Sequence, residues 1–398
     1  MNAYPPAQLG DIADVVAGDP APQDPQAFAP DGPLFVRMQD VGRHHRHPAL
    51  SDSADRLSSD WLAQNRLRLF PKGSILIPKS GASVNLNHRA KLATDAYVVS
   101  HLAVVIPDRT RIEPDYLYWW SVAYDPRAQA QVTSLPSLKL STLKAATIYL
   151  PPLDEQRRIV GILNRAAKIE RLRARAQELM GEFIPALFIR MFGGQHQVSV
   201  RYPCMPLREI TEIGSGVTKG RRIDSANAIE VPYLRVANVQ DGYLNLDQIK
   251  SIRIRRGEER KYALVPGDLV MTEGGDPDKL GRAAVWKGEL RYCAHQNHVF
   301  RVRPHTEVVL TDYLRDVAGS AYGKAYFLSV AKRTTGIASV NKTQLGGFPV
   351  PVPPVELQAL YAKIVANARD IASVSENAAR EAVALNASLM NRLLGAVE

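Results

Sequence analysis

The stretch LPPLDEQ at Leu150–Gln156 is followed 202 residues later by VPPVELQ at Val352–Gln358. Each opens an apolar-striped segment of about forty residues, which closes with ALFIRMFG at Gly193 in the first copy and with SLMNRLLG at Gly395 in the second. Since half of the 398 residues is 199, this period divides the chain into two similar halves. A duplicated unit that ends in a long helix can build a pseudo-twofold molecule, which suits a partner with two sites.

The repeat continues through the globular part of each half in the same order. Leu9–Ile12 corresponds to Leu207–Ile210, and Phe35–Met38 corresponds to Tyr233–Val236, with both pairs 198 residues apart. Several collinear matches arise by chance far less often than any one of them, so we expect the order domain–helix–domain–helix. The predicted boundaries are 1–150 and 201–352 for the two domains, 151–193 and 353–398 for the two long helices, and 194–200 for a linker.

Within each half the local pattern is mixed. Short β-branched and aromatic runs between Gly, Pro and Asn predict strands, and irregular polar stretches predict loops. The expected fold class is therefore α+β, with two tandem domains of small sheets joined by two long antiparallel helices. The predicted elements are strands at Ser74–Ile77, Tyr97–Ile106, Leu269–Thr272 and His298–Val302, helices at Pro114–Val122 and Leu310–Ala318, and loops at Asp40–Arg56 and Gly214–Ser225.

The two long segments carry apolar residues at mixed spacings of three and four, which predicts a seam of the coiled-coil type. The paired prolines stand just before each helix, where a missing N–H does least harm. Pro185 should kink the first helix near its end, and forty helical residues would span about 55–60 Å. The residues predicted for this seam and for partner contact are Ile159, Ile162, Ile169, Phe183, Leu187, Tyr361, Ile364, Ile371, Leu385 and Leu389.

Composition indicates a globular protein, with 45% hydrophobic and 23% charged residues. The net charge of +10 and the pI near 9.5 permit a polyanionic partner such as nucleic acid. The two cysteines, Cys204 and Cys293, favour a reducing cytoplasm over a disulfide framework. No apolar run approaches the ~20 residues of a membrane helix, and the start MNAYPPAQLG lacks the signal-peptide pattern. We therefore expect a cytoplasmic protein.

Motifs that would indicate catalysis are missing from the sequence. There is no GxxxxGK[ST] phosphate loop, and no Pro-Pro pair has the flanking residues of an adenine methyltransferase tetrapeptide. No Pro-Asp pair is followed at a suitable distance by the Asp/Glu-x-Lys of a nuclease. His44, His45 and His47 lack a cysteine or acidic cluster to complete a metal shell, so a solvated basic loop is favoured over a metal site. We expect no catalytic residue, metal or cofactor in this chain.

The motifs taken together resemble those of one family. They are LPPLDEQ at the start of a long helix, Met-Phe-Gly at Met191–Gly193, and SVNKTQL at Ser339–Leu345 before the Pro-Val-Pro-Pro of Pro351–Pro354. In this order the chain resembles the specificity subunit of type I restriction–modification enzymes over essentially its whole length. The second copy departs from the pattern, with Val-Glu-Leu-Gln for Leu-Asp-Glu-Gln, Leu-Leu-Gly for Met-Phe-Gly, and a helix richer in alanine.

The resemblance implies a function in host defence. Each domain would be a target recognition domain that reads one half of a bipartite DNA sequence. The paired helices would act as a ruler and hold two methyltransferase (modification) subunits, which carry S-adenosylmethionine and methylate adenine. Motor/endonuclease (restriction) subunits, which use ATP and Mg²⁺, would join that complex. The chain itself would be a non-catalytic specificity subunit.

Basic and amide-bearing loops are the candidates for DNA contact, because Arg, Asn and Gln read base edges and phosphates. A plain solvated loop is the alternative at each of them. Arg37 and Arg235 stand at equivalent strand positions, where a structural ion pair competes with a phosphate contact. The residues predicted to bind DNA are Arg43, His44, Arg46, Lys79, Ser80, Asn85, Asn87, Arg89, Lys219, Arg221, Arg222, Lys279 and Arg282.

Two other classes of function compete with this interpretation. One is a recognition component of a fused or type II-like methyltransferase or nuclease system, which requires the catalytic motifs that are missing. The other is a coiled-coil scaffold that does not bind DNA, which explains the helices and leaves the two basic, loop-rich domains unexplained. Turnover by the purified chain would indicate the first, and binding without sequence preference would indicate the second.

Overall fold

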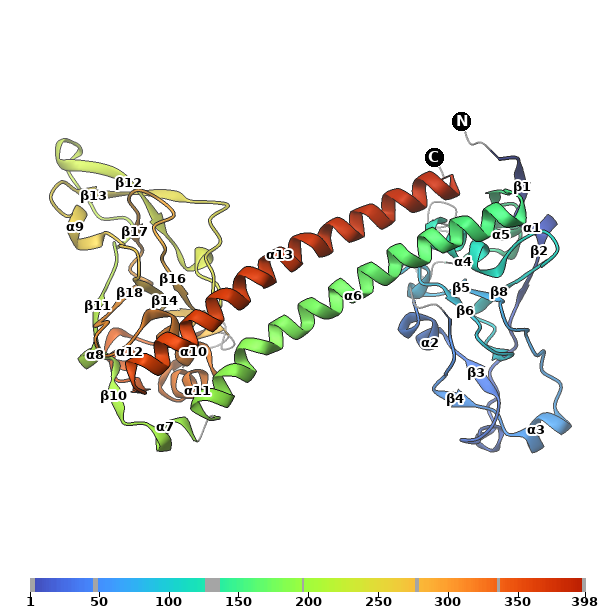
Figure 1. The fold of residues 1–398 in the computed structure, drawn as a ribbon, viewed down its shortest axis with the longest axis horizontal. Helices are drawn as coiled ribbons and strands as arrows, with labels where there is room; N and C mark the ends of the chain where they lie inside the picture. The colour runs from blue at the N-terminus through green and yellow to red at the C-terminus, as the bar shows by residue number, and fades with distance from the viewer. Residues whose placement is uncertain are drawn as a thin grey trace. The chain divides into compact units, whose positions relative to one another are not determined.

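The computed structural model describes residues 4–45, 49–125, 137–194, 197–275, 279–334 and 337–395. It divides into two compact units: unit 1 comprises Met1–Ala176 with Ser375–Glu398, and unit 2 comprises Gln177–Val374. Helix α6 (Leu153–Phe192) begins in unit 1 and ends in unit 2, and helix α13 (Val355–Leu394) begins in unit 2 and ends in unit 1 (Figure 1). Both long helices were predicted to within one to four residues at each end, so the proline pairs do mark their starts.

Unit 1 is built from small sheets and short helices around the first part of α6. Its further elements are β1 Pro6–Gln8, α1 Leu9–Ile12, β2 Ala13–Ala17, β3 Leu34–Val36, α2 Met38–Arg43, β4 Asp55–Arg56, α3 Ser59–Gln64, β5 Ile75–Pro78, β6 Ala90–Lys91, β7 Tyr97–Val98, β8 Leu102–Pro107, α4 Pro114–Ala123, α5 Leu140–Lys144 and β9 Thr147–Tyr149. A four-stranded sheet has the order β2-β8-β5-β6, a three-stranded sheet has the order β4-β3-β7, and β1 pairs with β9.

Unit 2 repeats this plan and adds to it. Its further elements are α7 Val198–Arg201, β10 Cys204–Pro206, α8 Leu207–Ile210, β11 Thr211–Gly214, β12 Ala228–Leu234, β13 Lys250–Arg255, α9 Glu259–Tyr262, β14 Leu269–Thr272, β15 Gly274–Gly275, β16 Ala283–Val285, β17 Ala294–His295, β18 Val299–Pro304, α10 Thr311–Gly319, α11 Ala321–Val330, β19 Lys332–Thr334, β20 Ile337–Ser339, α12 Lys342–Gly346 and β21 Pro349–Pro351.

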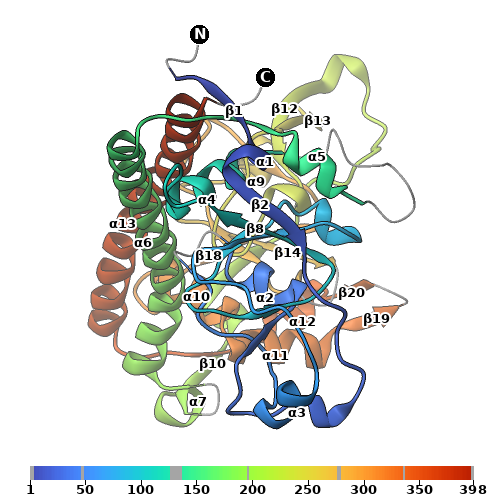
Figure 2. The ribbon, with the colours of Figure 1, turned by 90° about the vertical axis from the view of Figure 1, so that its right-hand side faces the viewer.

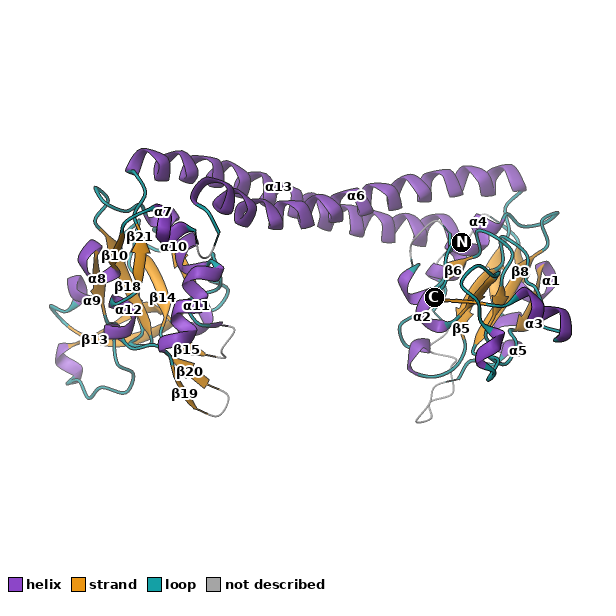
Figure 3. Cartoon of the chain, turned by 90° about the horizontal axis from the view of Figure 1, so that it is seen from below, coloured by secondary structure: helices purple, strands orange, loops and turns teal. Residues whose placement is uncertain are grey.

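The strand orders of unit 2 correspond one by one to those of unit 1. They are β11-β18-β14-β16, β13-β12-β17 and β10-β21. A further sheet, β15-β20-β19, occurs only in unit 2 among the described residues, and Figure 3 shows it as a separate ribbon. The repeated order confirms the predicted α+β class.

The four-stranded sheet of unit 1 is buried on both faces because its strands are apolar at successive positions. Ala103 and Val105 of β8 belong to the core shared with α4 and α6, whereas Leu102 and Val104 belong to the core shared with the three-stranded sheet. Strands covered on both faces lose the alternation of apolar and polar residues. Figure 2 shows α4 close to α6, with β2 and β8 beside it.

One predicted strand is two strands in the structure. The run Tyr97–Ile106 was predicted as a single strand, but β7 ends at Val98 and belongs to the three-stranded sheet, whereas β8 begins at Leu102 in the four-stranded sheet. The residues between them cross from one sheet to the other, with Leu102 N donating to Val99 O at 3.0 Å. Continuous apolar composition hides such a crossover, since both strands are buried.

A glutamine clamps the start of each long helix to the loop before a shorter helix. Gln156 accepts a hydrogen bond from Glu113 N (2.8 Å) and donates to the backbone carbonyls of Arg111 (3.0 Å) and Pro151 (2.9 Å). Its side chain is fully buried. A buried amide that satisfies three backbone groups is costly to replace, which gives the final Gln of LPPLDEQ a structural role.

The second copy of the motif forms the same clamp in unit 2. Gln358 accepts from Leu310 N (2.9 Å) and donates to the carbonyls of Val308 (3.0 Å) and Pro353 (2.8 Å). The repeated tyrosines act alike, since the hydroxyl of Tyr116 donates to Tyr149 O in unit 1 and that of Tyr313 donates to Pro351 O in unit 2. The motif is therefore a structural joint that occurs twice.

Within each unit the segments of α6 and α13 run in opposite directions. In unit 1, Asn386 Nδ2 donates to Glu170 Oε2 at 2.7 Å, while Leu163, earlier in α6, shares a core with Leu394, later in α13. In unit 2 the Phe192 ring lies 5.2 Å from the Tyr361 ring. Helix α6 continues through Pro185 to Phe192; the predicted kink stays a prediction.

The predicted seam is only partly buried. Ile159 and Tyr361 are buried, and Leu187 and Leu389 are partly buried. The coiled-coil-type spacing continues beyond the positions that other elements of the chain cover, and partner contact at the exposed positions stays a prediction. Residues with more than two-fifths of their surface exposed are Ile169 (47%), Phe183 (41%), Ile371 (60%) and Leu385 (56%), while Ile162 and Ile364 are half-buried.

Candidate nucleic-acid interface

The loop after β5 carries three of the predicted DNA contacts in unit 1. Lys79 and Ser80 are half-buried and Asn85 is exposed. The Ser80 hydroxyl lies 2.8 Å from His101 Nδ1, and a β-bridge joins Ser80 to Ser137. The backbone of this loop is therefore held in place while the Asn85 side chain faces outward, an arrangement suited to a surface contact.

Two residues of the same predicted set have internal roles. Arg89 is 1% exposed, and its guanidinium donates to the carbonyls of Ser121 (3.0 Å) and His88 (2.7 Å) and to Asn87 Oδ1 (2.6 Å). Burial lowers the pKa of Arg89 to about 10. The prediction that Arg89 contacts DNA is wrong for this structure, because its donors are used inside unit 1. Asn87 has φ = 50° and serves the same internal network.

The basic stretch that follows β3 is anchored by a buried carboxylate. Asp40 is fully buried, accepts from Arg37 N (2.8 Å) and Ala54 N (3.1 Å), and pairs with Arg43. The Arg43 side chain remains 54% exposed despite this ion pair. His44 is half-buried, with Nδ1 2.9 Å from Asp40 O. Arg46 lies outside the described residues, and its DNA contact stays a prediction.

In unit 2 the three predicted residues near 220 differ in their surroundings. Lys219 and Arg222 are exposed. Arg221 is half-buried and binds Glu258 through two nitrogens, at 3.1 and 2.9 Å, and the Tyr262 hydroxyl at 3.2 Å. This charge-assisted pair holds the pKa of Glu258 below its usual range. Arg221 is thus a brace for the loop, and Lys219 and Arg222 remain the accessible members.

The two basic residues near the Gly274-Gly275 pair are both half-buried. Arg282 Nη1 donates to Gln240 Oε1 at 3.0 Å. Lys279 stands at the edge of the described range 279–334. Neither residue has the open exposure of Lys219, and their predicted DNA contact stays a prediction.

Arg37 and Arg235 occupy equivalent positions with equivalent structural tasks. The Arg37 backbone N donates to Asp40 Oδ2 at 2.8 Å, and the Arg235 backbone N donates to Asn238 Oδ1 at 2.9 Å. The Arg37 side chain pairs with Asp55, whereas Arg235 donates to Gln248 O at 3.0 Å. The structural interpretation weighed for these two arginines fits these contacts.

An exposed basic strand of unit 2, β13, was not among the predicted residues. Strand β13 reads KSIRIR, and from Ile252 to Arg255 its side chains alternate between buried isoleucines and exposed arginines. Period-two alternation is the ordinary signal of a half-buried strand, and it was present at 250–255.

Among the described residues, no group of three or more His, Cys, Asp or Glu side chains is placed to hold a metal ion. His47, one of the three histidines considered for such a site, lies outside the described ranges. Cys204 is exposed and Cys293 is buried, and burial raises the pKa of the Cys293 thiol to about 12. In the part of the chain that the structure describes, no helix is both long and apolar enough to span a bilayer.

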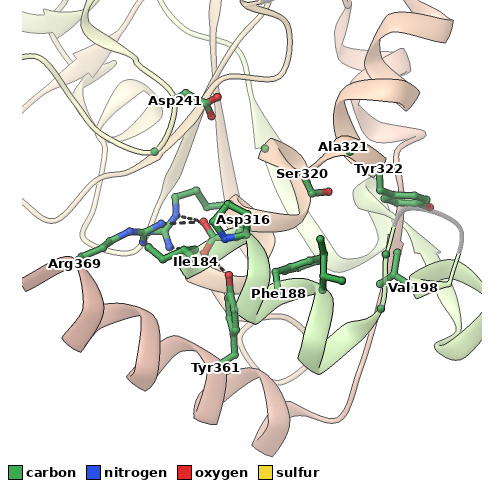
Figure 4. Close-up of a pocket in the computed structure, with 17 residues that line it drawn as sticks. Ile184, Phe188, Val198, Asp241, Asp316, Ser320, Ala321, Tyr322, Tyr361 and Arg369 are labelled. Carbon is green, nitrogen blue, oxygen red and sulfur yellow. Dashed lines mark hydrogen bonds and ion pairs between the residues drawn. The ribbon is translucent and has the colours of Figure 1, made fainter. Parts of the chain in front are cut away.

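A cavity of about 350 Å³ lies in unit 2 where α10 faces α6 and α13 (Figure 4). Ile184, Phe188 and Tyr361 form part of its wall, and an ion network forms another part. Asp316 accepts from Arg315 Nε (2.8 Å), Arg369 Nη2 (3.0 Å) and the Tyr361 hydroxyl (2.9 Å). Burial raises the pKa of Asp316. The side chains of Asp316, Arg315, Arg369 and Tyr361 are bound to one another, so this part of the wall has the character of a structural joint.

Comparison with known proteins finds similarity to type I restriction specificity subunits. Residues 6–179 match the family model of the type I restriction modification DNA specificity domain. The chain is 26% identical over 163 residues to a Methanocaldococcus jannaschii protein named as the MjaX specificity subunit of a type I restriction enzyme, with 40% of this chain and 38% of that protein aligned. It is 21% identical over 319 residues to the type I restriction enzyme StySPI specificity subunit of Salmonella potsdam, which aligns 75% of this chain and 68% of that protein.

A solved structure extends the likeness to the whole chain. The type I restriction–modification S subunit from M. genitalium superimposes with a TM-score of 0.60 and 14% identity, covering 99% of this chain and 97% of that one. At this level of identity the match concerns the fold. It includes both units and both long helices, whereas the family model covers only the first half of the sequence.

Proposed function

We propose that this chain reads a bipartite sequence in duplex DNA, as the non-catalytic specificity subunit of a type I restriction–modification complex. The family match over residues 6–179, the names of the relatives and the fold likeness support this role. The observation that carries it is the repeated strand order of the two units, each with its own set of basic loops. Two readers of one fold with different surface residues suit two different half-sites.

The physical chemistry of base recognition favours two readers. A small domain reaches only a few base pairs through donors and acceptors at the major-groove edges, so two domains on one chain lengthen the site. Readers on one face of B-DNA stand about 34–36 Å apart, one helical turn. Helices of 40 residues each, α6 and α13, are about 60 Å long and are sufficient to set such a spacer.

The chemical steps would belong to other subunits. We propose that the exposed apolar residues of α6 and α13, such as Phe183 and Ile371, contact two methyltransferase subunits, and that motor/endonuclease subunits join them. S-adenosylmethionine, ATP and Mg²⁺ would bind to those partners, and this chain would hold no cofactor. Such a complex, acting on chromosomal DNA, would work in the cytoplasm.

Binding of the full chain to duplex DNA in increasing salt tests this proposal. Non-specific binding to phosphates weakens steeply with salt, so a sequence reader keeps a preference for its target duplex after binding to a scrambled duplex is lost. The target is the sequence found methylated in cells that carry the gene and unmethylated after its deletion. Equal loss of both duplexes at every salt concentration would contradict the proposal.

Cofactor-dependent methylation by the purified chain alone is the matching control. No transfer to adenine is expected when the chain is incubated with S-adenosylmethionine and the target duplex. Transfer that begins when methyltransferase subunits are added supports the division of labour. Turnover without them would identify the chain as an enzyme.

A further inference from the structure

Strand β13 presents a row of cations on a surface that the core of unit 2 holds in place. It pairs with β12 in an antiparallel ribbon from Ala228↔Arg255 to Tyr233↔Lys250. Ile252 and Ile254 are buried among apolar residues, and Lys250, Arg253 and Arg255 are exposed. Because side chains alternate across a strand, the arginines share one face that cannot turn inward without exposing the isoleucines.

The cations on this face are not neutralised within the chain. In the described part of unit 2, no carboxylate lies within ion-pair distance of Arg253, Arg255 or Arg256. Arg253 Nη2 has only a weak contact with Ser225 Oγ, at 3.3 Å. Glu230 stands opposite Arg253 in the register without forming a pair, and Glu258 is occupied by Arg221.

The sequence around the ribbon strengthens the positive charge. Residues 250–261 hold six basic side chains and two acidic ones. Figure 1 shows that α9, which follows β13 and carries Arg260 and Lys261, lies beside the β12–β13 ribbon. Both of them are exposed. Such a concentration of like charge is repulsive in isolation and favours a polyanionic partner.

The corresponding ribbon of unit 1 lacks this property. There β3 pairs with β4 through only Leu34↔Arg56 and Phe35↔Asp55, and Asp55 is paired with Arg37. Arg56 is paired with Asp52 at 3.0 Å and donates to Gly32 O at 3.1 Å. The positive ribbon is therefore a feature of unit 2 and is not required by the shared fold.

We propose that the exposed face of β13 binds the phosphate backbone of duplex DNA beside the half-site that unit 2 reads. Arg253 and Arg255 are two residues apart, about 7 Å along the strand, and each DNA strand carries about two phosphates over that length of axis. Two guanidiniums that start from neighbouring positions on one face of a strand suit phosphate oxygens, which accept bidentate contacts. The inference rests on the proposed function, and it makes unit 2 the anchor that sets the orientation of the chain on DNA.

The test replaces both arginines in the full chain. The double variant Arg253→Gln and Arg255→Gln removes two charges at exposed positions, so an unchanged circular dichroism spectrum and thermal midpoint are expected. The matched control, Lys342→Gln with Lys363→Gln, removes two exposed charges from α12 and α13 of the same unit. Affinity for the target duplex and for a scrambled duplex is measured by fluorescence anisotropy from 50 to 300 mM salt.

Two lost phosphate contacts predict a definite change. The slope of log affinity against log salt should fall in magnitude by about 1.8 for both duplexes, with the ratio of the two affinities unchanged. The control should keep the slope of the original chain. An unchanged slope in the β13 variant would overturn the inference.

The outcomes separate this inference from the proposed function. Selective loss of the target duplex would make the arginines base readers and overturn the phosphate assignment. If the original chain prefers the target duplex but the variant keeps the same salt slope, only the assignment of phosphate contacts to β13 is wrong. If the original chain binds both duplexes equally while the salt slope falls in the variant, the phosphate assignment holds and sequence-specific reading is wrong. If the original chain binds neither duplex, both the proposed function and the assignment of phosphate contacts to β13 are wrong.

Discussion

Unit 1 and unit 2 have the same strand order, yet they fill the place where a short helix meets the long helices with different chemistry. In unit 1 that place holds Trp119, whose Nε1 donates to Asn164 Oδ1 at 3.0 Å. In unit 2 the corresponding position, 197 residues later, is Asp316, the centre of an ion network with Arg315 and Arg369. The same position of the shared fold therefore holds an aromatic contact in unit 1, the aromatic joint, and an ion network in unit 2, the ionic joint.

What stays the same in both units is the set of backbone contacts around the motif. The glutamine clamp and the tyrosine hydroxyl bond appear twice with nearly equal distances. What differs is the surface residues and the side chains at the contact between the short helix and the long helices. The comparison teaches that the frame is specified by a few buried polar side chains, which leaves loops and ribbons free to differ between the readers.

The ionic joint should be the most sensitive point of unit 2. Asp316→Ala leaves Arg315, which is 4% exposed, with one carboxylate fewer, and removing one partner of a buried pair costs about 3–5 kcal/mol. Chemical denaturation should show this loss, and hydrogen exchange should place it in unit 2. Asp370→Ala on α13 of the same unit is the control, because Asp370 is exposed and outside the network, and it should cost under about 1 kcal/mol. Equal effects of the two changes would contradict the ionic joint.

The clamp should matter equally in both units. Gln156→Ala and Gln358→Ala each leave one N–H and two carbonyls without a partner, which we expect to cost about 3 kcal/mol. Hydrogen exchange should show faster opening of unit 1 in the first variant and of unit 2 in the second. The exposed Lys168→Ala on α6 serves as the control. A variant that leaves both units as protected as before would refute the clamp.

Acid should weaken unit 2 more than unit 1. His295 is fully buried, and burial lowers its pKa to about 4 from the ordinary 6.5. Between pH 6.5 and pH 4 His295 is therefore protonated in the unfolded state and neutral in the folded state. Its contribution to the free energy of unfolding is complete above pH 6.5 and is lost as the pH falls toward 4. The expected loss is about 2 kcal/mol at pH 5.

The corresponding position in unit 1 supplies the control for this effect. In unit 1 Val98 pairs with Val36, and in unit 2 His295 pairs with Leu234, so Val98 is the residue equivalent to His295. His295→Val should flatten the pH dependence of the stability of unit 2 between pH 7 and pH 5, measured by urea denaturation. A variant that remains as acid-sensitive as the original chain would assign the effect to other groups.

The aromatic joint of unit 1 should respond least. Asn164→Ala removes the acceptor for Trp119 Nε1 at an exposed helix position, and we expect about 1 kcal/mol of destabilisation. Thermal denaturation with hydrogen exchange in unit 1 would measure it. A loss as large as that of Asp316→Ala would show that the two joints are not different in kind.

The sequence was sufficient for the long helices, because proline pairs and an apolar stripe are local signals. It was sufficient for β14, predicted and observed at Leu269–Thr272. It failed at Tyr97–Ile106, where a crossover between sheets depends on tertiary packing. The buried guanidinium of Arg89 was equally hidden, since only the fold brings Ser121 and Tyr124 beside it.

The seam shows how a correct period can still mislead. Apolar residues recur along both helices, but burial at Ile159 and Tyr361 comes from the domains that pack there, and Ile371 between such points is exposed. Spacing predicts a face and does not say what covers it. In contrast, the arginines of β13 alternate with buried isoleucines, which is a local signal that the sequence contains.

Exchange of residues 201–352 for the second domain of another specificity subunit, followed by single-molecule methylation mapping of cells that carry its partner subunits, tests the central claim most directly. Two independent readers predict that one half of the methylated sequence changes while the other half and the spacer stay as they were. A change in both halves, or in neither, would contradict the account.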